Sequence, residues 1–450
     1  MRILHLPETY LPWTTGGKEV YCHSLTRMLT EAGVENHVAI HQKPEEASSP
    51  GLSWHEGIPV HVLPPLPGYA SRRSVYTKEF DELPGLEALL DELRPDIVHF
   101  HDQGGGASLS HMRAVKAHGC RIVLTCHSPG QTCPQRELLR YGRIPCDGEV
   151  LLQRCSACRL TVSGVPRPIS DAVSMVEWPG INPWSASPVS RVLTGRLTTR
   201  LFRESLREFI RLTDAVIALA QWSAEVWRLN DCPESKLHLI RTGGPRAYTG
   251  IFPARFPERK PLRIVCSGRC VRIKGFHVLV EAVQSLPADF PVQVQFLSAT
   301  WTDQYAEDLQ RRIEGDARFL PPRYVAPAEV LSVVTEMDVA VVPSLWLETG
   351  PMTVLDAFAA RVPVIGSRLG GIAELVRDGV DGLLFSPGHA AELAACIRGL
   401  VENPDRLRAL TENIHAPRTF REIGAEHLRL YHDLMGNPAG AGENREAIST

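Results

Sequence analysis

Two acids, Glu348 and Asp356, stand eight positions apart in the stretch SLWLETGPMTVLDAFAARVP, which begins at Ser344. The residues that follow the first acid, Thr349-Gly350-Pro351-Met352, predict a loop that leads into a helix. Backbone N–H groups at such a helix start favour a phosphate or a polar hydroxylated ligand. One acid could then hold a sugar and the other a ribose. An exposed acid before a turn, followed by an ordinary amphipathic helix, explains the same spacing.

The elements around the two acids favour the binding interpretation. Apolar runs at 338–343 and 362–366 predict buried strands, and Gly370-Gly371 predicts a turn into a second helix. The resulting order is strand, acid loop, helix, strand, glycine turn, helix. That order is typical of one half of a doubly wound nucleotide site.

This segment resembles the donor-binding motif of the family 4 glycosyltransferases, whose pattern is Glu, seven residues, Glu. The resemblance implies an α/β fold of the GT-B type, with two Rossmann-like, doubly wound parallel-sheet domains facing a central cleft. It also implies retention of anomeric configuration, contact of Glu348 with the transferred sugar, and contact of Asp356 with the nucleotide ribose. Asp356 departs from the pattern by one methylene, so a bridging water or a backbone shift would have to close that distance.

Two cations follow the apolar run 262–266, in Ser267-Gly268-Arg269 and Lys274-Gly275. Arginine can hold a phosphate with its planar fork and lysine as a point charge, so the pair suits a diphosphate leaving group. Ordinary surface charge explains the same residues when they are taken alone. The family carries a glycine-arginine and a lysine-glycine at this point, which match Gly268, Arg269, Lys274 and Gly275. The resemblance further places the nucleobase near Arg323 or Tyr324.

Near the N-terminus, Gly16-Gly17 follows the first predicted strand and opens a helix. Backbone N–H groups there could approach a phosphate, although a plain turn explains the glycines equally well. The segment lacks the P-loop pattern, because Ser or Thr does not follow its Gly-Lys, and it lacks the spaced glycines of a dinucleotide fingerprint. These departures count against ATPases and dehydrogenases.

Two histidines, His101 and His127, each end a predicted strand of the first half. Ligand groups gather at such strand ends, and imidazole exchanges hydrogen bonds near neutral pH. A structural histidine is the alternative at both positions. The family has a histidine at each place, and the resemblance puts His127 near the transferred sugar and the acceptor.

The resemblance implies a front-face reaction of a nucleotide-diphosphate sugar with an acceptor hydroxyl or amine. Arg269 and Lys274 would stabilise the departing diphosphate, whose oxygen can take the acceptor proton. No Asp-x-Asp motif is evident, so we expect no catalytic Mg²⁺ and no other catalytic cofactor. The acceptor would be a sugar, a lipid-linked molecule or a small molecule. A nucleotide-sugar epimerase and a catalytically silent sugar-nucleotide-binding subunit are the alternatives.

A length of 450 residues predicts two domains. We expect a first domain over 1–247 with a cysteine-rich insert at about 133–158, a linker over 248–261 and a donor-binding domain over 262–416. The resemblance then implies a helix over 417–435 that returns to the first domain. The polar residues 436–450 predict a disordered tail.

A formal net charge of -3 argues against a nucleic-acid partner. Because no run of eighteen apolar residues exists and residues 1–6 predict a core strand, we expect a cytoplasmic protein. Much later in the chain, residues 196–211 predict a basic helix whose arginines are spaced near one helical turn. It is either a solvated face or a peripheral contact at the inner membrane face, and its arginines are Arg196, Arg200, Arg203, Arg207 and Arg211.

Among 11 cysteines, four fall in one Pro/Gly/Arg-rich segment: Cys133, Cys146, Cys155 and Cys158. Four thiols with this spacing can form a tetrahedral structural zinc site. Buried or unlinked thiols and a redox pair explain the segment as well.

Overall fold

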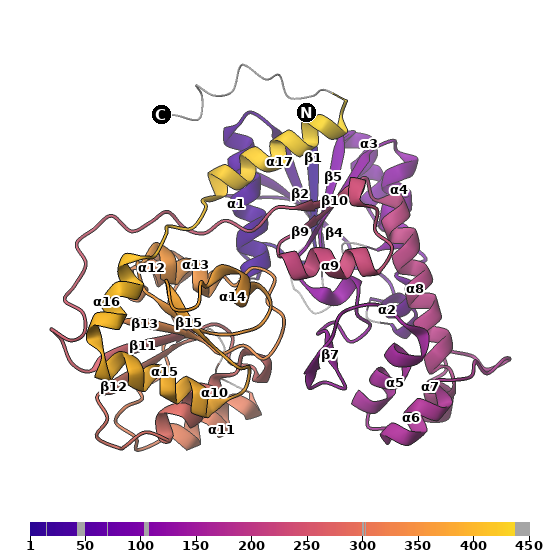
Figure 1. Cartoon of the computed structure of the whole chain (residues 1–450). Coiled ribbons are helices and arrows are strands. Elements are labelled where there is room, and N and C mark those ends of the chain that lie inside the picture. The colour runs from indigo at the N-terminus through magenta and orange to yellow at the C-terminus, as the bar shows by residue number, and fades with distance from the viewer. Residues whose placement is uncertain are drawn as a thin grey trace. The chain divides into compact units, whose positions relative to one another are not determined.

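The computed structural model describes residues 1–14, 16–42, 50–69, 71–102, 108–298, 301 and 303–436. The chain divides into two compact units (Figure 1). The first unit is Met1–Arg241 with the chain from Phe420 onward, and the second is Thr242–Thr419. The predicted disordered tail lies outside the described residues, apart from Gly436.

The first unit is built on a sheet of eight strands in the order β10-β9-β6-β5-β1-β2-β4-β3. All paired neighbours among these strands are parallel except β3 and β4. The strands are β1 (Arg2–Pro7), β2 (Glu35–His41), β3 (Gly51–His55), β4 (Ile58–Leu63), β5 (Ile97–His101), β6 (Arg121–Cys126), β9 (Ala215–Ala218) and β10 (Leu237–Leu239). The chain builds outward from β1 to one side and then crosses to β5 on the other, so the topology reverses between β1 and β5.

Helices cover both faces of this sheet, as the alternation of its side chains requires. Leu4 of β1 and Val98 of β5 pack into one apolar cluster, while Ile3 and Ile97 pack into another. The helices of this unit are α1 (Gly17–Glu31), α2 (Arg72–Thr77), α3 (Leu86–Leu93), α4 (Leu109–Ala117), α5 (Leu152–Val162), α6 (Arg167–Val173), α7 (Pro188–Leu193), α8 (Gly195–Leu212), α9 (Gln221–Leu229) and α17 (Phe420–Leu434).

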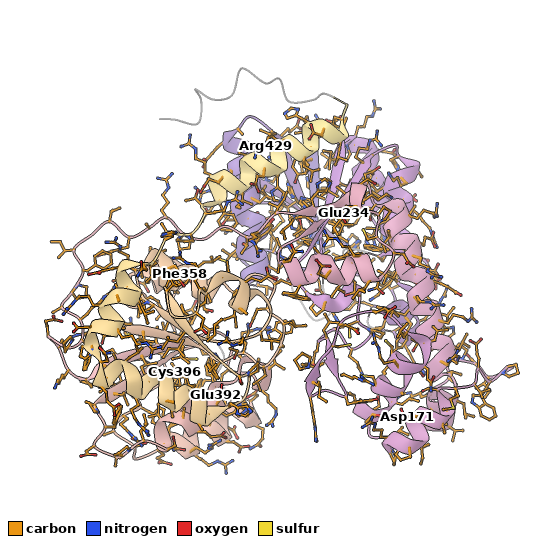
Figure 2. All side chains as sticks on the ribbon, in the orientation of Figure 1. Asp171, Glu234, Phe358, Glu392, Cys396 and Arg429 are labelled. Atoms are coloured by element: carbon orange, nitrogen blue, oxygen red, sulfur yellow. The ribbon has the colours of Figure 1, made fainter. Side chains whose placement is uncertain are left out.

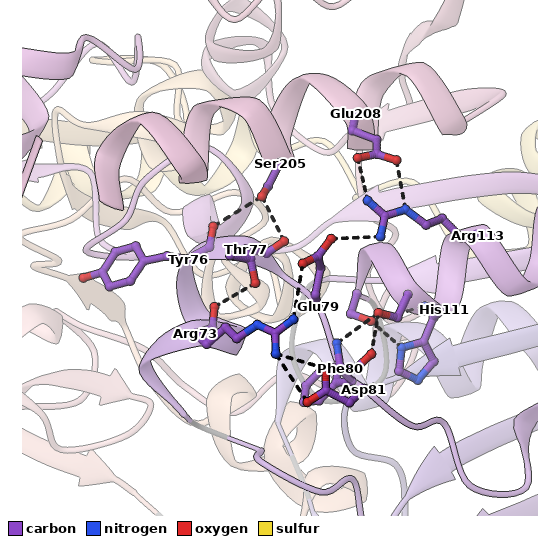
Figure 3. A network of polar contacts seen from close by, with 12 residues as sticks. Arg73, Tyr76, Thr77, Glu79, Phe80, Asp81, His111, Arg113, Ser205 and Glu208 are labelled. Carbon is purple, nitrogen blue, oxygen red and sulfur yellow. Dashed lines mark hydrogen bonds and ion pairs between the residues drawn. The ribbon is translucent and has the colours of Figure 1, made fainter. Parts of the chain in front are cut away.

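A polar network ties α8 to the segment that follows α2 (Figure 3). Arg113 of α4 pairs with Glu208 of α8 at 2.7 Å and with Glu79 at 2.8 Å. The Ser205 hydroxyl donates to the carbonyl of Thr77 at 2.9 Å. These contacts attach α8 to α4 and to residues 77–79. A two-stranded hairpin of β7 (Leu139–Arg140) and β8 (Ile144–Pro145) precedes α5 in the chain.

The second unit has a five-stranded parallel sheet in the order β12-β11-β13-β14-β15. Its strands are β11 (Leu262–Ser267), β12 (Val292–Leu297), β13 (Val339–Val342), β14 (Val364–Ser367) and β15 (Gly382–Phe385). Its helices are α10 (Phe276–Gln284), α11 (Gln304–Ile313), α12 (Pro327–Thr335), α13 (Met352–Ala359), α14 (Gly370–Leu375), α15 (Ala390–Glu402) and α16 (Pro404–Glu412). Alternate residues of β11 enter two apolar clusters, one on each face, and Phe358 of α13 belongs to the second of them (Figure 2).

The segment predicted as a linker, 248–261, packs along the second unit. The Asp338 carboxylate accepts hydrogen bonds from the backbone N–H groups of Phe256, at 2.9 Å, and Arg263, at 2.7 Å. Phe256 is buried, and Arg255 donates to the carbonyl of Ala360 at 2.9 Å. Its prolines predicted an interdomain linker, and a buried aromatic ring and a shared carboxylate attach this segment to the second unit.

The closing helix, α17, lies beside α1 in the first unit (Figure 1). Its residue His427 shares a hydrogen bond of 3.1 Å with the Tyr21 hydroxyl on α1. Tyr431, also on α17, is buried, and its hydroxyl lies 2.7 Å from Nδ1 of His99 on β5. The last helix therefore completes the polar interior of a sheet that begins at residue 2.

Replacing Tyr431 by Phe should destabilise the protein, because it leaves a buried nitrogen of His99 without this partner. We expect the free energy of unfolding to fall by about 1–3 kcal/mol, measured as a lower melting temperature. Tyr324→Phe is the control, since Tyr324 is 65% exposed. Equal melting temperatures for Tyr431→Phe and the wild type would contradict a stabilising hydrogen bond between Tyr431 and His99.

Candidate active site

The two predicted phosphate- and sugar-binding loops of the second unit lie at a topological switch point. The chain runs from β11 outward to β12 and then crosses back to β13, which lies on the other side of β11. Ligands of doubly wound sheets bind beyond the carboxyl ends of the strands at such a reversal. The loop with Lys274 follows β11, and the loop with Glu348 follows β13.

Lys274 and Glu348 meet as an ion pair. The Lys274 Nζ lies 2.6 Å from Oε1 of Glu348, and the Ser344 hydroxyl donates to the same oxygen at 2.7 Å. Glu348 is only 6% exposed. Burial by itself raises the pKa of Glu348, but the charge of Lys274 and hydrogen bonds from Lys274 and Ser344 outweigh it and hold the pKa below its ordinary value. Glu348 is thus a fixed carboxylate that orients the ammonium group beside it.

Glycines allow the two loops to approach this closely. Gly275 has φ +71, and a Cβ there would lie 1.9 Å from the carbonyl oxygen of Pro343. Gly371 donates its N–H to the Glu348 carbonyl at 2.7 Å, where a Cβ would meet the same oxygen. A larger residue at Gly275 would separate the two loops, and one at Gly371 would push the Glu348 loop away from α14.

Arg269 lies on the same loop as Lys274 and is exposed. Within the described part of the chain, its guanidinium makes no hydrogen bond or ion pair. Gly268, which precedes it, has φ +137. This loop therefore offers one cation bound to an acid and another that an anionic ligand can reach.

Arg323 lies at the same edge of the sheet. It pairs with Leu297, the last residue of β12, through its N–H to Phe296 at 3.0 Å and its carbonyl to the Ser298 N–H at 3.1 Å. Arg323 and its neighbour Tyr324 are exposed. The position is consistent with the predicted nucleobase contact, which stays a prediction.

Asp356 faces a small cavity between sheet and helices. The loop Thr349-Gly350-Pro351-Met352 leads into α13 as expected, and Asp356 follows one turn into that helix. The cavity is lined by residues of β11, β13, α12 and α13, among them Ser267 and Thr353. Burial raises the pKa of Asp356 to about 7, and among the described residues no side chain pairs with it. A ligand hydroxyl would supply the partner that this carboxyl group lacks.

In the first unit, the predicted residues gather at the switch point between β1 and β5. His101 ends β5, and His127 follows β6; His101 Nδ1 lies 3.2 Å from His127 Nε2. Gly16 precedes α1, and Gly17 is its first residue. In that first turn, Lys18 pairs with Glu8 at 3.1 Å. Burial, then the charges of Lys18 and His427, lower the pKa of His127 to about 3, so its imidazole is neutral near pH 7.

Asp102 is a site residue that the sequence reasoning missed. It is buried with φ +67 and accepts hydrogen bonds from the N–H groups of His127, at 2.6 Å, and Ser128, at 2.9 Å. Its place directly after a strand was an available signal. Ser344 and Trp346, which surround Glu348, carried no comparable signal because hydroxyl and indole groups are common in loops.

The cysteine segment does not bring its sulfur atoms together as a metal site requires. Cys133, Cys146, Cys155 and Cys158 are half-buried, and no three of their sulfurs lie within 4.8 Å of one another. Two other described groups reach that spacing, His5-Cys22-His101 and His23-His55-Glu56, although hydrogen bonds already engage nitrogens in both. A structural zinc site stays a prediction.

The arginine row on α8 is largely paired within the protein. Arg200 binds Glu177 at 2.8 Å, Arg207 binds Asp231 at 3.3 Å and Arg211 binds Glu208 at 3.3 Å, while Arg196 donates to the Ser174 carbonyl. This pairing favours the solvated face over a membrane contact. Among the described helices, none combines the length and apolarity needed to cross a membrane.

Two family models match this chain. The model described as glycosyltransferase family 4 matches residues 15–162, and the model described as glycosyl transferases group 1 matches residues 261–403. Each match covers about one third of the chain and the two together nearly two thirds, and the second includes Arg269, Lys274, Glu348 and Asp356. The chain belongs to the family 4 glycosyltransferases.

Named relatives in this family include a D-inositol 3-phosphate glycosyltransferase of Corynebacterium kroppenstedtii, 31% identical over 40% of this chain and 43% of the relative. A glycogen synthase of Mycobacterium tuberculosis is 26% identical over 49% of this chain and 55% of the relative. The chain thus spans about half the length of these two relatives. A D-inositol 3-phosphate glycosyltransferase of Pseudarthrobacter chlorophenolicus is 24% identical over 86% of this chain and 83% of the relative.

Solved structures of similar fold cover nearly the whole chain. Anabaena HepE in complex with UDP-glucose aligns with a TM-score of 0.61 at 16% identity, covering 97% of this chain and 99% of HepE. Sucrose-phosphate synthase from Thermosynechococcus elongatus aligns with a TM-score of 0.60 at 18% identity, covering 97% and 99%. At these identities the likeness concerns the fold alone, and the predicted GT-B class is confirmed.

The pKa of Asp356 predicts a pH-dependent stability. Its folded value of about 7 lies above the ordinary 3.8, so the folded state binds the proton more tightly and loses stability as pH rises from about 4 to 7. Asp356→Asn removes this loss of stability. We therefore expect the melting temperature of the variant, measured relative to that of the wild type, to be higher at pH 8 than at pH 5. A difference independent of pH would show that Asp356 titrates normally.

Proposed function

We propose that this family 4 member is a retaining glycosyltransferase that moves a sugar from a nucleotide-diphosphate donor to an acceptor hydroxyl or amine. The Lys274–Glu348 pair at the switch point of the second sheet is the observation that supports it most directly. Solved structures of the same fold include complexes with UDP, with UDP-glucose and with ADP, which favours a nucleoside diphosphate donor.

The proposed chemistry is electrostatic. Arg269 and Lys274 stabilise the negative charge that grows on the diphosphate as the glycosidic bond breaks. Glu348 keeps the ammonium of Lys274 oriented and accepts a hydrogen bond from the sugar. The leaving phosphate oxygen takes the acceptor proton on the same face of the ring, so no protein base is required. Gly16 and Gly17, at the start of α1, offer backbone N–H groups to an anionic part of the donor.

Asp356 is proposed to hold the ribose. With a pKa of about 7, its carboxyl group can either donate to or accept from a ribose hydroxyl. Both protonation states therefore support binding near neutral pH. The acceptor is proposed to be a sugar, a lipid-linked molecule or a small molecule, with His101 and His127 on its side.

A thermal-shift screen of nucleoside diphosphates, followed by a transfer assay with the matching sugar donors, tests this function. Ligands that bind the folded state raise the melting temperature. We expect one nucleoside diphosphate to raise it and its sugar conjugate to act as donor. An isomerised donor without transfer would identify an epimerase, and binding with neither transfer nor slow donor hydrolysis would identify a silent subunit.

Replacing Lys274 by Ala should lower the turnover of sugar transfer by about 10²–10³-fold, the range seen when one transition-state donor is removed. Arg311→Ala on α11 is the matched control, because it removes an exposed cation paired only across one helical turn. Melting temperatures of both variants show whether they fold. A folded Lys274→Ala variant with wild-type turnover would refute the assigned role.

A further inference from the structure

A row of hydrogen-bonded imidazoles runs through the first unit and ends at His127. Asn36 Oδ1 lies 3.1 Å from His5 Nε2, and His5 Nδ1 lies 3.1 Å from His101 Nε2. His101 Nδ1 lies 3.2 Å from His127 Nε2. The two middle rings, His5 and His101, therefore each use both nitrogens: Nε2 faces the Asn36 end of the row or the next ring, as His5 Nε2 contacts Asn36 and His101 Nε2 contacts His5, and Nδ1 faces the His127 end.

Strand periodicity places these side chains on one face of the sheet. His5 has the same parity as Ile3 on β1, His101 the same as Ile97 on β5, and His127 the same as Val123 on β6, and all three apolar residues pack in one cluster. The strands are neighbours in the order β6-β5-β1-β2, and Asn36 lies on β2. The row therefore crosses four adjacent strands.

The backbone sets the direction of the first hydrogen bond. The amide nitrogen of Asn36 donates to the carbonyl of Val34 at 2.9 Å and to the Thr30 hydroxyl at 3.1 Å. A carbonyl can only accept, so the NH₂ group of Asn36 faces Val34 and its oxygen faces His5. That oxygen can only accept, so the hydrogen of this contact lies on Nε2 of His5.

The hydrogen on His5 Nε2 then determines which nitrogen donates in each later contact of the row, because the rings are neutral. Burial lowers the pKa of His5 to about 4, that of His101 well below its ordinary range and that of His127 to about 3. A neutral imidazole has one N–H, so Nδ1 of His5 accepts from Nε2–H of His101. By the same rule, Nδ1 of His101 accepts from Nε2–H of His127. Cys22 lies beside the first two rings, and burial raises its pKa, which keeps it a thiol.

We propose that Asn36 is a positioning residue which, through His5 and His101, fixes His127 as the tautomer with hydrogen on Nε2 and a lone pair on Nδ1. The lone pair accepts hydrogen bonds, so Nδ1 selects a donor such as a sugar hydroxyl and disfavours a phosphate oxygen, which can only accept. The part of this inference that concerns the sugar rests on the proposed function. The tautomer itself does not.

Nitrogen-15 NMR of histidine-labelled protein tests the proposal, because the two tautomers give different ring-nitrogen shifts. His127 is assigned by the loss of its signals in His127→Asn. We expect the Nε2–H form in the wild type, whatever its activity. The Nδ1–H form, or an equal mixture, in the wild type would overturn the proposal without any variant.

Asn36→Leu removes the acceptor that begins the row, so the His127 signals should shift toward the other tautomer. Thr30→Val is the matched control, because the Val34 carbonyl still orients the Asn36 amide and the wild-type pattern should persist.

Once a donor sugar is known, kcat/KM of Asn36→Leu should fall about tenfold, as for one lost hydrogen bond, with nucleoside diphosphate affinity unchanged. An unshifted His127 in folded Asn36→Leu would refute the relay; failure of sugar transfer in the wild type would refute only the proposed function.

Discussion

A carboxylate that is almost wholly buried, Glu348, imposes the tightest constraint on the second unit. An uncompensated charge at such a place costs several kcal/mol, so the ammonium of Lys274 has to lie within contact distance. Two loops that follow neighbouring strands can deliver these groups only if their backbones nearly touch. Gly275 permits that approach, and Ser344 supplies a second donor to the same oxygen.

The first unit meets the same problem with neutral groups. The carboxyl ends of β1, β5 and β6 converge at its switch point, where imidazoles take the place of charged side chains. Because burial keeps these rings neutral, they need hydrogen-bond partners and no counter-ion. Tyr21 of α1 and His427 and Tyr431 of α17 provide partners for this interior, so the two ends of the chain contribute to one polar core.

Much of the fold followed from alternation and turn residues. Short apolar runs marked the strands, and glycines marked the turns after β11 and before α14, where no other residue fits. The spacing from Glu348 to Asp356 placed both acids across the start of α13, as the structure has them. The segment 248–261, which its prolines predicted to be an interdomain linker, is attached to the second unit by Asp338 and the buried Phe256, and neither contact has a local sequence signal.

The sequence by itself determined which residue types stand at the strand ends and on which face of each strand they lie, because a period of two needs no knowledge of neighbours. Only the tertiary structure decided which strands are adjacent. That adjacency pairs Lys274 with Glu348 across 74 positions and joins Asn36 to His127 through two intervening rings. It also leaves Asp356 in a cavity without a paired charge, so its pKa follows from burial, a property that no short stretch of sequence contains.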